Sequence, residues 1–106
     1  MHSFEDIKKR SESDDELVVG YNDAMELLYL FEKSNTQVLG WEGLVKYEDG
    51  NIGHSQKYLG TADLSGIPNT SAIAIIKSTI MQAHTEWEEN PEVSNASLLF
   101  CIIINT

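Results

Sequence analysis

Hydrophobic residues recur along this chain with two periods, one typical of helices and one typical of strands. Between residues 22 and 34 the helical period is carried by Ala24, Leu27, Leu28 and Phe31. These positions follow the i, i+3, i+4, i+7 pattern, which places them on one face of a helix. Asn22 is a suitable N-cap for this helix, and Asn35 is a suitable residue to end it.

A second helical stripe predicts a longer helix over about residues 70–89. Its members are Ile73, Ile76, Ile80, Ala83, His84 and Trp87. Asn69, Thr70 or Ser71 can cap its start, and Asn90-Pro91 ends it. A capping box made by Ser3 and Asp6 predicts a further, short helix from about Phe4 to Arg10.

Residues 38–58 show the pattern of a β-hairpin. Asp49-Gly50 favours a type I′ turn, in which both central residues have positive φ. A two-residue loop here sets the following pairs across the hairpin: Tyr47 with Ile52, Val45 with His54, Gly43 with Gln56, and Trp41 with Tyr58. This register places His54 and Gln56 on the apolar face of the hairpin together with Trp41.

Two more segments are expected to be strands. Leu17-Val18-Val19 is short and extended, and residues 97–105 are apolar at successive positions and rich in Ile. Such a continuous apolar run is typical of a central strand that is covered on both faces. The whole pattern predicts one α+β domain over residues 1–106, with a small, mainly antiparallel sheet packed against helices.

The charge balance narrows the possible partners. The chain has 106 residues, of which 17 are acidic and 7 are Lys or Arg, so its formal net charge is −10. This charge repels nucleic acids and anionic membrane surfaces and favours encounter with basic proteins. The start of the sequence lacks the basic and apolar regions of a signal peptide, and the C-terminal apolar run is too short to cross a bilayer. We therefore expect a protein of the cytoplasm that binds neither membranes nor nucleic acids.

The sequence offers little that is typical of catalysis. Cys101 lies in the most apolar segment, where a thiolate is disfavoured, and the neighbouring residues His54 and Ser55 point to opposite faces of a strand. One cysteine and three scattered histidines provide no metal-ligand spacing. We expect a protein that is not an enzyme and that holds no metal and no cofactor.

Acidic residues near aromatic ones favour a protein-binding function. The exposed acids predicted to contact a partner are Asp14, Asp15, Glu16, Glu48, Asp49, Glu88, Glu89 and Glu92. Aromatic anchors with a charged rim give protein interfaces their affinity and specificity. The alternative is a small ligand-binding or enzymatic domain with a pocket around Trp41, His54 and Gln56.

Several short sequence motifs support the protein-binding interpretation. They are Gly40-Trp41-Glu42-Gly43, Tyr47-Glu48-Asp49-Gly50, Gly53-His54-Ser55, Tyr58, and Gly60-Thr61-Ala62-Asp63-Leu64, preceded by residues 16–24. Over roughly residues 16–65 the chain resembles small immunity proteins encoded beside polymorphic toxins, including those of contact-dependent growth inhibition systems in bacteria.

The resemblance implies a stoichiometric inhibitor whose partner is a cognate toxin domain. Proteins of this kind bind the toxin domain delivered by a neighbouring cell and block its active site or its access to substrate. Many such toxins are nucleases, whose substrate groove is basic because it holds phosphates. An acidic inhibitor is electrostatically suited to that groove.

Overall fold

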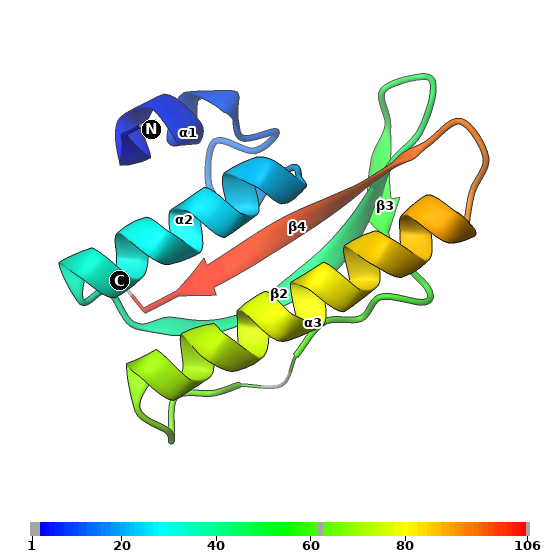
Figure 1. Cartoon of the computed structure of the whole chain (residues 1–106). Helices are drawn as coiled ribbons and strands as arrows, with labels where there is room; N and C mark the ends of the chain where they lie inside the picture. Colours follow the sequence, from blue (N-terminus) through cyan, green and yellow to red (C-terminus); the bar gives the residue numbers. More distant parts are fainter. Residues whose placement is uncertain (1–2, 62, 106) are drawn as a thin grey trace.

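The computed structural model describes residues 3–61 and 63–105, which form three helices and one four-stranded antiparallel sheet. The elements in chain order are α1 (Phe4–Arg10), β1 (Leu17–Val19), α2 (Tyr21–Ser34), β2 (Val38–Lys46), β3 (Ile52–His54), α3 (Asn69–Glu89) and β4 (Ser97–Ile104). The strand order is β1-β4-β2-β3, and α2 and α3 lie side by side across one face of the sheet (Figure 1). The predicted α+β fold is confirmed.

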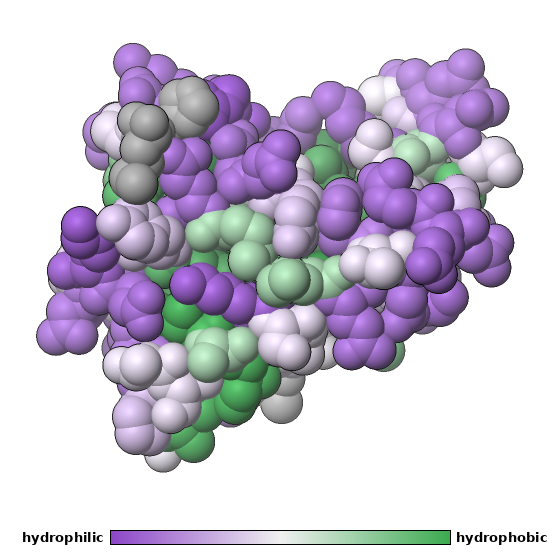
Figure 2. All heavy atoms as spheres, in the orientation of Figure 1, coloured by the Kyte–Doolittle hydropathy of each residue, from purple (hydrophilic) through white to green (hydrophobic). Residues whose placement is uncertain are grey.

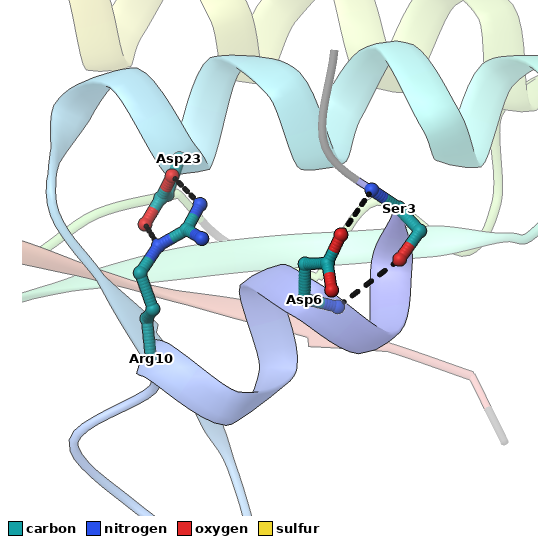
Figure 3. A network of polar contacts seen from close by, with 4 residues as sticks. All are labelled: Ser3, Asp6, Arg10 and Asp23. Atoms are coloured by element: carbon teal, nitrogen blue, oxygen red, sulfur yellow. Dashed lines mark hydrogen bonds and ion pairs between the residues drawn. The ribbon is translucent and has the colours of Figure 1, made fainter.

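The short helix α1 is held by its cap and by its contacts with α2. Ser3 Oγ accepts a hydrogen bond from the Asp6 N–H at 3.2 Å, and the Asp6 carboxylate accepts one from the Ser3 N–H at 3.3 Å. Arg10 then donates two hydrogen bonds to the Asp23 carboxylate, at 2.6 and 3.0 Å (Figure 3). The predicted capping box is therefore confirmed, and a two-pronged ion pair joins α1 to α2.

The starts of the two longer helices differ from the prediction. The N-cap of α2 is Gly20 and not Asn22, because the Ala24 N–H already bonds to the Gly20 carbonyl. The N-cap of α3 is Pro68. The Asn69 side chain instead accepts from the Val38 N–H and donates to the Thr36 carbonyl, so it joins α3 to the start of β2. The end of α2 was predicted correctly, since Asn35 has left-handed backbone angles.

One hydrophobic core lies between the helices and the sheet. The predicted stripes of α2 and α3 face it, and every member except His84 is buried. Phe100 is fully buried at the centre, with the ring of Trp41 at 5.4 Å between centroids. Figure 2 shows hydrophobic side chains in the seam between α2 and α3 and over the N-terminal part of α3, with polar side chains over most of the remaining face.

Strand β4 is central, as predicted, because it pairs with both β1 and β2. Residues on both of its faces are buried, as expected, although the described helices pack on only one of them. On the other face Leu99 and Cys101 form a small cluster with Val18, bordered by Leu44 and Ile103. These residues are buried by their neighbours in the sheet, which explains how an apolar strand can lack a second layer of helices.

The hairpin exists, but its predicted register is wrong by one residue. Leu44 pairs with His54, Val45 with Gly53, and Lys46 with Ile52. The Tyr47 N–H bonds to the Asn51 carbonyl, which leaves a three-residue loop of Glu48, Asp49 and Gly50. Gly50 has φ +93°, whereas Asp49 is not among the described residues with positive φ, so the turn is not type I′. The extra loop residue moves His54 to the other face of the sheet.

After β3 the chain makes a short turn and then continues along β2 in the same antiparallel direction. The Gly43 N–H bonds to the Tyr58 carbonyl, and the Thr61 N–H bonds to the Trp41 carbonyl. A Cβ atom at Gly60 would lie 1.8 Å from the Trp41 carbonyl oxygen, and Gly60 also has φ +93°. The close approach therefore requires glycine at position 60.

Candidate binding surface

A cavity lies at the end of β4. It has a volume of about 800 Å³ and is bordered by α1, α2 and the loop that precedes β1. Its apolar walls come from Phe4, Leu17, Leu30, Phe31, Ile103 and Ile104, and its acidic rim from Asp14, Asp15 and Glu16. We call it the β4-end cavity. Three of the eight acids predicted to bind a partner therefore border an apolar cavity, all from the one loop before β1.

The acidic loop of this cavity has a defined conformation. Ser11 Oγ accepts from the Val18 N–H at 2.9 Å and donates to the Glu16 carbonyl at 2.7 Å. Ser13 Oγ accepts from the N–H groups of Asp15 and Glu16, each at 3.2 Å. These bonds hold the backbone of residues 14–16 beside β1, so that backbone needs little ordering when a partner binds.

The carboxylates of Asp14 and Asp15 have no hydrogen-bond or ion-pair partner among the described residues, and both residues are exposed. Lys8 also lines the cavity and is its one basic residue within the described chain. The rim is therefore net negative. A cationic side chain that reaches it meets unpaired carboxylates beside an apolar wall.

The third acid, Glu16, contacts the only cysteine of the chain. Its carboxylate lies 3.5 Å from Cys101 Sγ, and Cys101 is 3% exposed. Burial, followed by the neighbouring Glu16 carboxylate, raises the pKa of the Cys101 thiol to about 12. The thiol is therefore protonated at neutral pH, and a nucleophilic role for it has no support.

The other predicted acids lie near the opposite end of β4. The hairpin tip follows Lys46, which pairs with Ser97 at the start of that strand. There Asp49 accepts two hydrogen bonds from Asn51, each at 2.9 Å, while Glu48 and Glu89 are exposed. Glu88 Oε1 lies 3.9 Å from His84 Nδ1. The structure thus divides the eight acids between two regions.

Glu92 has a different environment from its neighbours. Its carboxylate accepts from the Ser55 hydroxyl at 2.7 Å, from the Gln56 N–H at 3.0 Å and from the Lys57 N–H at 3.4 Å. Ser55 in turn accepts from the Tyr58 N–H at 2.8 Å. Burial pushes the pKa of Glu92 up, but these hydrogen bonds outweigh it and hold the pKa below its usual value. The residue joins the segment after α3 to the turn after β3.

The three residues of the alternative pocket are not brought together. Trp41 is 3% exposed, faces the helices, and donates from Nε1 to Thr79 at 2.9 Å. The His54 side chain is 77% exposed on the other face of the sheet, 3.9 Å from Glu42. Gln56 is exposed in the following turn. Trp41 instead borders a shallow hollow of about 240 Å³ with Lys57, Leu59 and Gln82.

Two features relevant to function are absent from residues 3–61 and 63–105. No three His, Cys, Asp or Glu side chains there are grouped closely enough to hold a metal ion. None of the helices in this part of the chain has both the length and the apolar character required to cross a bilayer. Comparison with protein-family models, curated proteins and solved structures finds no match to the chain.

Sequence reasoning identified the acidic rim but missed the apolar walls. Phe4, Phe31 and Ile104 come from α1, α2 and β4, and each was interpreted as part of a separate element. One signal was available: the apolar run of residues 98–104 is long, whereas the short predicted strand, residues 17–19, has only three residues. An apolar strand that extends beyond its neighbour leaves part of its edge and face uncovered.

Proposed function

We propose that this protein binds a basic protein partner at the β4-end cavity and that this partner is a bacterial toxin domain, which it neutralises. The observation that carries the proposal is that the Asp14 and Asp15 carboxylates, which have no partner among the described residues, lie on the rim of an apolar cavity of about 800 Å³. Aromatic or aliphatic side chains of the partner fill the cavity, and its cationic side chains contact the rim.

The two parts of this surface make different contributions. Burial of apolar side chains stabilises the complex by roughly 25 cal/mol for each Å² removed from water. The acidic rim adds specificity and speeds association, because the field of a protein with net charge −10 attracts a basic partner. Affinity therefore comes mainly from the cavity walls, and the rate of capture mainly from the charge.

The choice of a toxin as the partner rests on the resemblance over roughly residues 16–65 and on the acidity of the chain. Residues 16–65 include Glu16 and the whole of α2, which borders the cavity. A nuclease toxin has a basic groove that an acidic inhibitor can occupy. Neutralisation then takes place in the cytoplasm of the cell that makes the inhibitor, by occupation of the groove and without chemical change to either protein.

Co-expression with the toxin domain encoded beside this protein tests the proposal. We expect a one-to-one complex on gel filtration and normal growth of cells that express both chains. The matched control is the toxin domain expressed alone, which should arrest growth. A toxin domain that arrests growth equally in the presence of this protein, and that elutes separately from it, would refute the proposal.

A further inference from the structure

At the β4-end cavity, Ile104 stands opposite Val38 of β2 but has no strand partner among the described residues on its other side, where β1 lies. Asn105 donates its N–H to the Gln37 carbonyl, so residue 105 faces β2. Because N–H and C=O groups alternate sides along a strand, those of Ile104 point away from β2, toward the β1 side. Val38 stands opposite Ile104, but its N–H bonds to the Asn69 side chain and not to Ile104. This agrees with an Ile104 backbone that points away from β2.

Strand β1 is too short to reach Ile104. It begins at Leu17, which pairs with Ile102. The position opposite Ile104 would fall to Asp15, but the N–H of Asp15 bonds to Ser13 Oγ and the chain there is not a strand. Within the described residues the N–H and C=O of Ile104 therefore have no partner, and Ile104 lines the cavity. An open strand edge is a template for an added strand.

The surroundings of Ile104 define the side chains that such a strand needs. The Ile104 side chain packs with the main core, whereas Ile103 and Cys101 point to the other face of the sheet. A residue opposite Ile104 therefore directs its side chain toward the helices, where Phe4, Leu30 and Phe31 form apolar walls. Its two neighbours point to the face on which Glu16 contacts Cys101.

We infer that the β4-end cavity binds an extended segment of a basic partner, in which an apolar residue pairs its backbone with Ile104 and is flanked by cationic residues. This inference deepens the proposed function, since it uses the same cavity and names the form in which the partner enters. The negative charge of the rim attracts a basic segment and repels a second copy of this acidic chain.

The test uses the full chain and synthetic peptides, without the toxin. The probe is a five-residue peptide with free ends blocked and the sequence Arg-Val-Arg-Val-Arg. Its matched controls are the same peptide with both valine nitrogens methylated and the peptide Glu-Val-Glu-Val-Glu. Titrations are followed through the backbone amide signals of ¹⁵N-labelled protein, and hydrogen exchange of the Ile104 amide is measured with and without peptide.

We expect the basic peptide to bind, to shift the Ile104 amide signal and to slow its exchange. Methylation removes the donor that pairs with the Ile104 carbonyl, and the dissociation constant should rise about tenfold. The acidic peptide should not bind. Equal binding of the methylated peptide, an unchanged Ile104 amide, or no binding at all would overturn the inference. The proposed function is judged separately by the toxin complex, which can form through the cavity without strand pairing.

Discussion

At the scale of single residues, the structure separates acids that are available to a partner from one that is used internally. Glu92 accepts three hydrogen bonds from the turn after β3, whereas Asp14 and Asp15 accept none from the described residues. Sequence alone cannot make this distinction, because the donors Ser55, Gln56 and Lys57 lie far from position 92 in the chain. Exposed acids could be predicted from composition, but their partners could not.

Replacement of Glu92 by glutamine should destabilise the protein in a pH-dependent way. The pKa of Glu92 is lowered in the folded state, so its contribution to stability is present above the unfolded pKa, near 4.5, and is lost as the pH falls through the folded pKa. At pH 7 the loss of charge-assisted hydrogen bonds should reduce the free energy of unfolding by about 1–3 kcal/mol.

Urea unfolding of Glu92→Gln and the parent protein between pH 7 and pH 3 measures this effect. The two unfolding curves should converge as the pH falls below the usual carboxyl range. The control is Glu89→Gln, at an exposed position of α3, which should remain within about 0.5 kcal/mol of the parent. A difference between Glu92→Gln and the parent that does not change with pH would contradict the assigned hydrogen bonds.

Gly60 is a second residue whose role depends on its surroundings. An alanine there would combine positive φ with a clash against the Trp41 carbonyl, so Gly60→Ala should cost about 3 kcal/mol or more. Gly66→Ala is the matched control, since nothing lies within 4 Å of an added Cβ. Thermal unfolding followed by circular dichroism compares the two variants. Equal melting temperatures would show that the turn after β3 does not approach β2 as described.

At the scale of elements, hydrophobic periodicity predicted the helices and strands because each signal is local. The stripes of α2 and α3 and the apolar run of β4 can be identified within a few turns or a single strand. The hairpin register failed because it depends on one backbone angle. Asp49-Gly50 suits a two-residue loop, but in the structure Gly50 alone has positive φ and the loop has three residues. Residues within the loop do not specify which of these turns forms.

The short helix α1 should depend on its packing, since seven residues do not form a stable helix alone. Ile7 is fully buried, and Phe4 and Phe31 have ring centroids 5.7 Å apart. Ile7→Ala should reduce the free energy of unfolding by about 2–5 kcal/mol. Lys9→Ala, at an exposed position of the same helix, should have little effect. Urea denaturation provides both values, and similar losses in the two variants would contradict the docking of α1 on α2.

At the scale of the whole molecule, the acids predicted to bind a partner lie in two regions, one near each end of β4. One acidic group borders the cavity at the end of β4, and others lie around the hairpin tip and the end of α3 near its start. The net charge could be predicted from composition. The cavity could not, because its walls come from α1, α2 and β4, and only the folded chain brings these elements together.

Two charge reversals of equal size, compared in the assay with the toxin domain, locate the binding surface most directly. Asp14→Lys with Asp15→Lys changes the rim of the cavity, and Glu48→Lys with Asp49→Lys changes the hairpin tip by the same charge. We expect the first pair to slow association with the toxin domain by at least about tenfold and to reduce growth protection, while the second pair has a much smaller effect. If both variants fold, and cells with the hairpin-tip variant are no longer protected while cells with the rim variant are, then the toxin domain binds at the other end of β4. The proposed binding at the β4-end cavity would then be wrong.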